Sequence, residues 1–258
     1  IIGALLVVAP LLIIGVEAFS QGWKTYTATI NHPDTRHAIM LTVITALIAV
    51  PVNTAFGIAA AWAITQFDFR GRRFLLVLIE IPFSISPIVA GVAYLFVYGL
   101  QGLLGPLFAA YDIKVLFALP GIVIASMFVT APFVARELIP LMQAQGRDLE
   151  EAATSLGASG WRTFWSVTLP NIKWGLLYGV LLCNARAMGE FGAVSVVSGH
   201  IRRETNTMPL HVEILYNEYN IGAAFAVATL LAGLALVTLV LKTILEIRFG
   251  AGNAAGKH

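Results

Sequence analysis

The chain has 258 residues, of which 58% are hydrophobic and 12% charged, with a formal net charge of +2. Soluble domains carry about 25% charged residues, and a single core cannot bury so much apolar surface. The composition therefore excludes an ordinary soluble protein and predicts one that is embedded in lipid. With one cysteine, Cys183, the chain can form neither an intrachain disulfide nor a cysteine metal site.

Apolar runs along the chain are long enough to cross about 30 Å of hydrocarbon, which takes about 20 helical residues. They lie at 1–19, 38–65, 74–99, 115–141, 174–199 and 223–246. We expect an all-α, polytopic membrane protein with six transmembrane helices in a domain spanning 1–248, followed by a flexible tail at 249–258. The first run begins at Ile1 and lacks a basic n-region and an A-x-A site, so we interpret it as a retained helix rather than a signal peptide.

Lys and Arg residues are distributed unequally between the two sides that six spans create. One side holds Arg70, Arg72, Arg73, Arg136, Arg147, Arg162, Lys173, Lys242, Arg248 and Lys257, and the other holds Lys24, Arg36, Lys114, Arg202 and Arg203. Since positive charge is enriched in cytoplasmic loops, we expect both termini and the 143–173 segment to lie in the cytoplasm.

The span at 74–99 is interrupted by IPFSISPIVAG, residues 81–91. Pro82 and Pro87 each remove a backbone donor, and we expect both to bar a regular helix. Irregular backbone at membrane depth is tolerated where it is buried in protein or lines a wet cavity. The stretch indicates either a cavity-lining break or a proline kink that neighbouring helices repair.

The 147–170 segment is polar and predicts a compact helix-turn-helix outside the bilayer. The first helix opens with Asp148, Glu150 and Glu151, where the helix dipole favours negative charge. We expect Gly157 to end it in a left-handed cap. Ser159 then caps a second short helix, which we expect Pro170 to end.

Aromatic side chains are dense in the second of these helices, at Trp161, Phe164 and Trp165. They form either an aromatic belt at the membrane interface or, together with Leu156, anchors that fill a pocket on a cytoplasmic partner. The residues alone favour neither interpretation.

The spacing Glu-Ala-Ala, three residues, Gly, nine residues, Ile, one residue, Leu-Pro resembles the EAA loop of ABC importer permeases. The matching residues are Glu151, Ala152, Ala153, Gly157, Val167, Leu169 and Pro170, with Val167 as the one departure, in place of the usual Ile. FVTAPFVARELIPLMQAQG (128–146), RAMGEFGAVSVVSGHI (186–201) and ETNTMPLHVEILYNEYN (204–220) are similar to the W-type membrane subunit of bacterial sulfate/thiosulfate importers.

This resemblance implies a type I, molybdate- and maltose-like permease fold in the bacterial inner membrane. The loop at about 143–173 would then form coupling helices that dock on an ATP-hydrolysing subunit. The implied coupling residues are Glu151, Ala152, Ala153, Leu156, Gly157, Trp161, Phe164, Val167, Leu169 and Pro170. The implied partners are a second, T-type permease subunit, two ATP-binding subunits and a periplasmic sulfate-binding protein, with membrane lipid around the chain and no nucleic acid.

No G-x-x-x-x-G-K-[ST] loop that could cradle phosphates occurs in the sequence. We therefore expect no catalytic residue, metal or cofactor on this chain, which would be a non-catalytic subunit. ATP and Mg would be bound by the partner ATPase subunits.

Arg186 and Glu190 lie four residues apart in the fifth span, which predicts that they share one helix face. A charge at the bilayer centre costs about 3 kcal/mol on insertion scales, so we expect the two to pair or to face the pore. Two interpretations stay open: a gate in the pathway, or a buried ion pair that fixes helix packing.

Polar side chains within apolar spans mark a candidate translocation pathway. Besides Arg186 and Glu190, the candidates are Ser84, Ser86, Asn184 and Ser195, with amide donors near Phe83 that could bind an oxyanion. Ser195 could equally bond a carbonyl of its own helix. We interpret the outer histidines as surface residues or contacts to the binding protein, namely His32, His37, His200 and His211.

Together with these observations, the resemblance implies the permease of an ATP-driven importer that translocates sulfate or thiosulfate by alternating access. A molybdate or tungstate importer is the nearest alternative. A secondary anion transporter, driven by an ion gradient and using Arg186 and Glu190 as a proton relay, is an alternative of another class. The residues leave a homodimer open beside the heterodimer.

Overall fold

The computed structural model describes residues 2–245, in which helices joined by short loops make up the whole architecture and no strand occurs. The helices are α1 Ile2–Ser20, α2 Trp23–Asn31, α3 Pro33–Gln66, α4 Arg72–Ser84, α5 Pro87–Tyr98, α6 Gly105–Ala110, α7 Leu119–Thr130, α8 Pro132–Gln145, α9 Asp148–Ser155, α10 Gly160–Thr163, the π-helix η1 Phe164–Thr168, α11 Leu169–Met188, α12 Gly192–Ser198, α13 Met208–Asn217 and α14 Ile221–Leu245. The tail expected at 249–258 lies outside the described residues.

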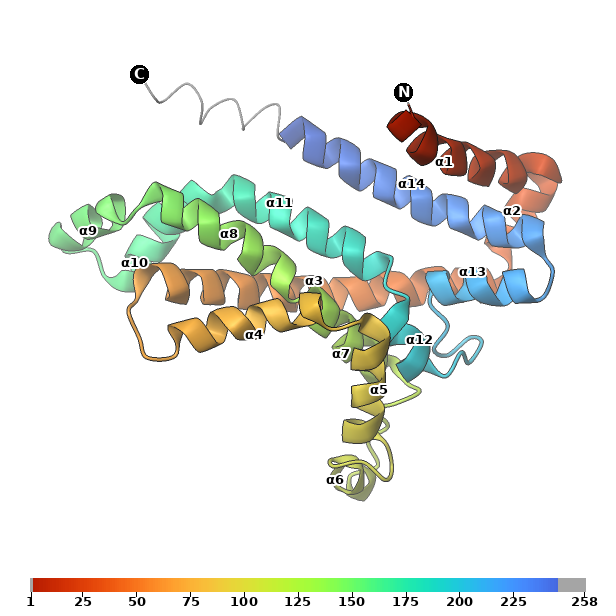
Figure 1. Cartoon of the computed structure of the whole chain (residues 1–258), viewed down its shortest axis with the longest axis horizontal. Coiled ribbons are helices and arrows are strands. Elements are labelled where there is room, and N and C mark those ends of the chain that lie inside the picture. The colour runs from red at the N-terminus through yellow and green to blue at the C-terminus, as the bar shows by residue number, and fades with distance from the viewer. Residues whose placement is uncertain (1, 246–258) are drawn as a thin grey trace.

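The long helices α3, α8, α11 and α14 run along the long axis of the molecule (Figure 1). The loop with α9 and α10 occupies one end of this bundle, and α2 and α13 lie toward the other. α5 and α6 project sideways from the body. The bundle thus carries the α9–α10 loop at one end and α2 with α13 toward the other.

The spans follow the expected apolar runs, but they are not six continuous helices. By length and composition, three stretches can cross a membrane unbroken: α3, Leu119–Gln145 and α14. Two further spans are bent pairs, α4 with α5 at 109° and Gly160–Met188 with α12 at 48°. The sixth expected span corresponds to α1, an apolar helix of 19 residues, Ile2–Ser20.

Small residues allow the central helices to approach closely. A Cβ built on Gly57 of α3 would lie 2.6 Å from the Cβ of Val134 on α8, and one built on Gly179 of α11 would lie 3.2 Å from the Cα of Val134. Without a hydrophobic drive between helices in lipid, such close packing is a main source of association. Val134 and Leu138 are fully buried in this three-helix core.

A buried polar junction secures the joint between α7 and α8. Asn53 of α3 donates from Nδ2 to the carbonyl of Met127 at 2.9 Å and to Oγ1 of Thr130 at 2.7 Å. The Cys183 thiol of α11 donates to the carbonyl of Thr130 at 3.7 Å. Pro132 begins α8 just after these residues, and side chains from α3 and α11 thus hold the end of α7 at this joint.

The interruption at 81–91 is confirmed, but the role expected for Pro82 is wrong. Pro82 lies inside α4, and the Ile85 N–H still bonds the Ile81 carbonyl at 3.1 Å. The helix breaks only at Ile85 and Ser86, and Pro87 starts α5 at a position where its missing N–H costs nothing. One proline is therefore absorbed within a helix, and the other restarts the chain in a new direction.

Candidate coupling loop and translocation pathway

α9 ends in a Schellman motif at Gly157, which has φ of 87°. The Gly157 N–H bonds the Thr154 carbonyl at 3.0 Å, and the Ala158 N–H bonds the Ala153 carbonyl at 3.0 Å. Both bonds satisfy carbonyls that the helix end leaves free. The acids expected in the first turn are there, at Asp148, Glu150 and Glu151. Local sequence therefore defines this half of the loop.

α10 is a single turn that continues directly into the fifth span. Ser159 caps it, accepting from the Arg162 N–H at 3.4 Å. The chain then passes through the π-helix η1, where the Leu169 N–H bonds the Phe164 carbonyl, and enters α11. The expectation that Pro170 ends the segment is wrong, because the π-turn shifts the hydrogen-bond register just before the proline. α10, η1 and α11 form one rod, Gly160–Met188.

Polar and aromatic contacts tie the loop to the bundle. Arg147 Nε donates to the Thr65 carbonyl near the end of α3 at 2.8 Å. Glu150 Oε1 accepts from Thr168 Oγ1 at 3.1 Å, which joins α9 to η1. These bonds fix the loop against α3 and η1, so it is not a free linker.

The aromatic residues of the loop divide into one packed ring and two exposed rings. Phe164 packs against Trp62 of α3, with ring centroids 5.2 Å apart. Trp161 is 68% exposed, and Trp165 is exposed beside it. Leu156, at the tip, is 90% exposed. The sequence did not separate Phe164 from the two tryptophans, because its partner Trp62 lies about a hundred residues away.

The other predicted coupling residues also lie in this loop. Glu151, Ala152, Gly157 and Pro170 are exposed, and Ala153, Val167 and Leu169 are half-buried. Sequence reasoning missed Leu149, a large exposed apolar side chain. Its spacing of seven residues from Leu156 could have found it, since such spacing places side chains on one helix face. The loop thus presents an apolar surface at its tip.

Arg186 and Glu190 form an ion pair across a helix break. Arg186 Nη1 lies 2.5 Å from Glu190 Oε2, and the Glu190 side chain is 1% exposed while that of Arg186 is 33% exposed. The expectation of a shared helix face is wrong, because α11 ends at Met188 and α12 begins at Gly192. Glu190 Oε1 also accepts from the Ala193 N–H at 3.0 Å. The pair therefore braces the break between the two helices.

The two broken spans meet at their breaks. A Cβ on Gly192 at the start of α12 would lie 2.9 Å from the Cβ of Pro87 at the start of α5. A Cβ on Gly91 would lie 2.8 Å from that of Val196. Because these glycines have no side chains, α5 and α12 can lie side by side although they are far apart in the sequence.

The four polar pathway candidates differ in whether their side chains already form hydrogen bonds within the chain. Ser195 donates to the Gly192 carbonyl at 2.8 Å, so it bonds its own helix. Ser84 does the same with Glu80, at 3.4 Å, and Asn184 Nδ2 points at Met188 Sδ at 3.7 Å. Ser86 caps α5 without a side-chain hydrogen bond and is exposed. Ser86 is thus the candidate best placed to meet a ligand.

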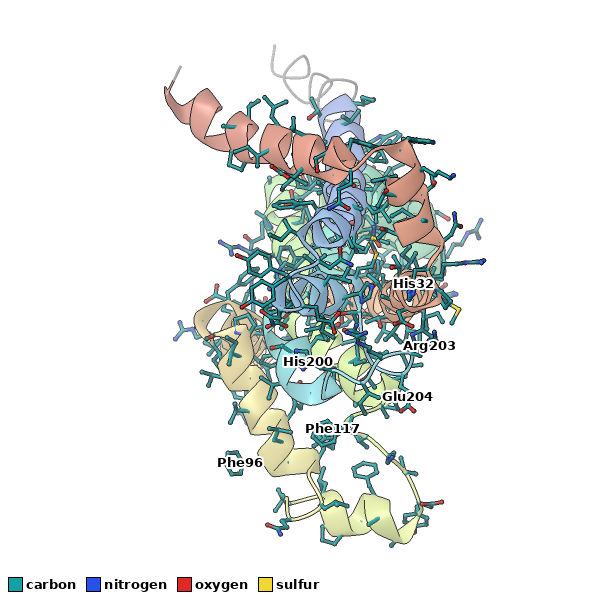
Figure 2. The ribbon with its side chains drawn as sticks, turned by 90° about the vertical axis from the view of Figure 1, so that its right-hand side faces the viewer. His32, Phe96, Phe117, His200, Arg203 and Glu204 are labelled. Carbon is teal, nitrogen blue, oxygen red and sulfur yellow. The ribbon has the colours of Figure 1, made fainter. Side chains whose placement is uncertain are left out.

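Ion pairs hold the loop that follows α12. Arg203 Nε donates to Asp34 Oδ1 on α3 at 2.6 Å, and Arg202 pairs with Glu218. His200 Nε2 lies 3.1 Å from Glu213 Oε2. His200 and Arg203 lie on this loop below His32, where α3 begins (Figure 2). The loop is thereby tied to α3 and α13.

The interpretation of His211 as a surface residue is wrong. His211 is 2% exposed, with Nε2 3.1 Å from Thr35 Oγ1 and Nδ1 3.2 Å from Asn206 Nδ2. α13 packs this face against α3 and α14, and the partner Thr35 lies 176 residues away along the chain. Burial lowers the pKa of His211. The imidazole is therefore a neutral hydrogen-bonding group that joins α13 to α3.

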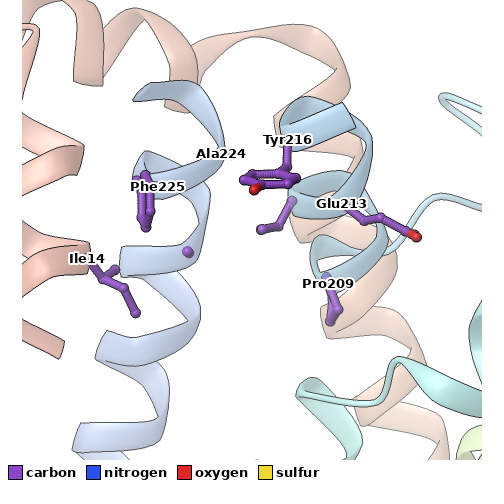
Figure 3. Close-up of a pocket in the computed structure, with 8 residues that line it drawn as sticks. Ile14, Pro209, Glu213, Tyr216, Ala224 and Phe225 are labelled. Carbon is purple, nitrogen blue, oxygen red and sulfur yellow. The ribbon is translucent and has the colours of Figure 1, made fainter. Parts of the chain in front are cut away.

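An apolar cavity of about 380 Å³ lies between α1, α13 and α14. Ile14, Tyr216 and Phe225 line it, and the carboxylate of Glu213 points away from it (Figure 3). Such a lining suits acyl chains or side chains, and it offers nothing to an anion. The cavity is thus no part of a polar pathway.

Comparison with known proteins places the chain among transport proteins. The family model described as "Binding-protein-dependent transport system inner membrane component" matches residues 53–250. The sulfate transport system permease protein CysW of Escherichia coli (strain K12) is 52% identical over 248 residues, covering 96% of this chain and 85% of the relative. CysW of Synechocystis sp. is also 52% identical, covering 97% and 91%. CysT of Escherichia coli (strain K12) is 33% identical, covering 95% and 89%.

Solved structures agree in fold. A bacterial ABC transporter involved in the import of alginate matches with a TM-score of 0.79 at 16% identity, covering 96% of this chain and 92% of that one. The alginate transporter in complex with an alginate-loaded periplasmic protein matches with a TM-score of 0.76 at 17% identity, covering 96% and 91%. At these identities the likeness establishes the fold, which is that of an ABC importer permease. With the family model and the relatives along nearly its whole length, this chain belongs to the binding-protein-dependent transport system inner membrane component family, in the branch of the CysW sulfate permeases.

Proposed function

We propose that this chain is the membrane permease subunit of an ATP-driven importer that translocates sulfate or thiosulfate by alternating access. The observation that carries the proposal is 52% identity, over 96% of the chain, to a sulfate transport system permease protein. Permeases of this family are non-catalytic, and a separate subunit hydrolyses ATP.

The 143–173 loop is the proposed coupling site for that ATPase. Support comes from its apolar tip, where Leu156 and Trp161 are exposed in the single chain. Aromatic and aliphatic side chains of this kind contribute most of the binding energy when a partner buries them. Because α10 runs without a break into α11, a push on the loop would tilt the fifth span as a lever. Its far end carries the Arg186–Glu190 pair and the contact with α5.

The proposed assembly contains this chain, a T-type permease, two ATP-binding subunits that bind ATP and Mg, and a periplasmic sulfate-binding protein. The similarity to CysT supports a related second permease, and the fold neighbour that binds a periplasmic protein supports the last partner. We place the assembly in a bacterial inner membrane with both termini of this chain in the cytoplasm, as the Lys and Arg distribution favours.

The proposed pathway passes the meeting point of the two breaks. Ser86, exposed and without a side-chain bond, would contact the anion there. Ser84, Asn184 and Ser195 would contribute after releasing bonds within their own helices. The Arg186–Glu190 ion pair would act as a gate in the pathway, at the break between α11 and α12.

Reconstitution of the complete complex in proteoliposomes tests the function. We expect ATP-dependent uptake of labelled sulfate, competed by thiosulfate more strongly than by molybdate. Sulfate movement along a proton gradient without an ATPase partner would overturn the proposal, and preferential molybdate uptake would replace the substrate.

Leu156→Arg tests the coupling site. Because Leu156 is 90% exposed, the change spares the fold, but a charge in an apolar pocket of the ATPase should abolish co-purification and uptake. Tyr219→Arg, at an equally exposed position toward the other end of the bundle, is the matched control and should retain co-purification with the ATPase. Normal co-purification of the Leu156→Arg chain would rule the loop tip out as the docking site.

A further inference from the structure

A cavity of about 290 Å³ lies between α4 and α8, on a face that the single chain leaves open. Its polar lining comes from Glu80 on α4 and from Arg136 and Gln143 on α8, and Phe83 closes one side. α4 and α8 lie alongside each other in the half of the bundle that carries the coupling loop (Figure 1).

Glu80 and Arg136 lie at the same depth. Glu80 is eight residues from the start of α4, and Arg136 is nine residues from the end of α8, which places them about 12 and 13 Å into the bundle from the loop end. Both residues are exposed in the chain alone. Since ionisable groups at membrane depth face the bundle interior or water rather than lipid, this face turns toward the interior of the assembly.

Arg136 is held in place by an aromatic ring rather than by a carboxylate. Its Cζ lies 4.8 Å from the centroid of the Phe83 ring, which in turn packs on Phe133 at 5.2 Å. Arg136 and Glu80 share the cavity, yet neither belongs to an ion pair that the structure shows within residues 2–245. Arg186, by contrast, forms an ion pair with Glu190, in which Nη1 lies 2.5 Å from Oε2.

This arrangement suits a tetrahedral oxyanion. A guanidinium offers a planar fork of N–H donors that matches two oxygens of such an anion. The Phe83 ring fixes the fork two residues before the α4–α5 break, next to exposed Ser84 and Ser86. The Glu80 carboxylate in the same cavity opposes a dianion, which keeps binding weak enough for release, as conduction requires.

We propose that Arg136 forms a transient binding site for tetrahedral dianions such as sulfate in the inner half of the translocation pathway. In this site, the Glu80 carboxylate weakens the binding of the dianion. The proposal rests on the function proposed above and adds to it a binding residue on the cytoplasmic side of the helix breaks. A hydrophobic helix interface would leave the guanidinium without an acceptor, and a packing ion pair would bring Glu80 and Arg136 into contact.

The test uses the complete complex in proteoliposomes with labelled sulfate. R136Q should lower the ATP-driven uptake rate by at least about tenfold, the loss that a charged hydrogen bond to a ligand carries. R136K should fall between R136Q and the unchanged complex, because it keeps the charge and loses the fork. All complexes should assemble with the same subunit ratio.

Charge restoration separates an anion site from a packing contact. In R136C, a cationic thiol reagent should raise uptake and an anionic one of similar size should not, while neither changes the parent complex, whose Cys183 is buried. Failure of the cationic reagent to raise uptake in R136C would instead indicate a packing contact and overturn the proposal.

Two further outcomes overturn the proposed anion site at Arg136 and leave the proposed function standing. One is R136Q uptake within twofold of the parent complex, and the other is failure of R136Q to assemble, which would assign Arg136 to a subunit interface. If the parent complex itself moves no sulfate, the proposed function fails, and the Arg136 variants play no part in that result.

Discussion

Buried polar side chains specify how the helices of this permease meet. Asn53 joins α3 to α7, His211 joins α13 to α3, and Glu190 joins the two halves of the fifth span. Each bonds a residue on another element, and a buried polar group without partners is costly. Such residues therefore select one packing among the many that apolar surfaces alone would allow.

Asn53→Leu should destabilise the permease. The change is close to isosteric but removes both Nδ2 hydrogen bonds at the α7–α8 joint, which should cost about 1–3 kcal/mol. The thermal unfolding midpoint of the detergent-solubilised chain measures this loss. Thr238→Val is the matched control, because half-buried Thr238 bonds its own helix at the Leu234 carbonyl, and it should shift stability by less than about 0.5 kcal/mol. Equal midpoints for the two variants would contradict the role of Asn53.

His211 should make stability depend on pH. Burial lowers the pKa of His211 in the folded chain, so the unfolded chain binds a proton first as pH falls through about 6.5. The unfolded state is then favoured, and stability falls until the pH drops below the folded pKa. Between pH 8 and 5.5, the unfolding midpoint should drop more steeply for the parent chain than for His211→Gln. An unchanged slope in His211→Gln would refute the prediction.

Among the elements, the rod formed by α10, η1 and α11 differs most from what its sequence suggests. A Leu-Pro pair usually marks a boundary, but here a π-turn absorbs the proline and keeps the helix continuous. The loop therefore has one rigid arm in the membrane. Its other arm, α9, depends on the turn at Gly157 for its direction.

Gly157→Val should misdirect α9 and weaken coupling. Gly157 has φ of 87°, and a β-branched residue there costs about 1–2 kcal/mol or more. We expect reduced ATPase co-purification and faster amide hydrogen exchange over 148–159. Gly157→Asn should be milder, because Asn tolerates the left-handed region. Gly160→Ala is the control in the same loop, where the space is open, and a loss there equal to that of Gly157→Val would exclude the turn geometry as the cause.

For the whole molecule, the two ends of the bundle differ in character. One end presents the exposed apolar tip at Leu156, and the other carries the ion pairs of Asp34, Arg203 and their neighbours. An apolar tip suits a permanent partner subunit, whereas an ionic surface suits a partner that binds and leaves. The Lys and Arg distribution predicts that the Leu156 end faces the cytoplasm.

Thiol labelling should report this orientation. Ser155→Cys and Tyr219→Cys place exposed thiols at opposite ends, and Cys183 is buried. In cells with the outer membrane removed, an impermeant maleimide should label Tyr219→Cys at once and Ser155→Cys only after the inner membrane is opened. Labelling of Ser155→Cys in closed cells would reverse the topology.

Much of the fold was predictable because it depends on local composition. The positions of the apolar helices, the break near 81–91 and the cap at Gly157 all follow from runs of a few residues. The burial of His211 and the packing of Phe164 on Trp62 were not predictable, since each needs a partner distant in sequence. The resemblance to sulfate permeases is confirmed by the relatives, because the residues that carry it extend over much of the chain.

The sequence by itself determined that the chain crosses a membrane, where it crosses, and which loop carries the EAA spacing, because hydrophobic length and turn chemistry are properties of contiguous residues. Only the tertiary structure decided that α10 is an extension of α11, that the breaks of two spans lie together, and that Arg136 faces Glu80 across a cavity without pairing. The physical reason is that helix packing in lipid depends on small residues and scattered polar contacts between distant segments, and these leave little periodic signal along the chain.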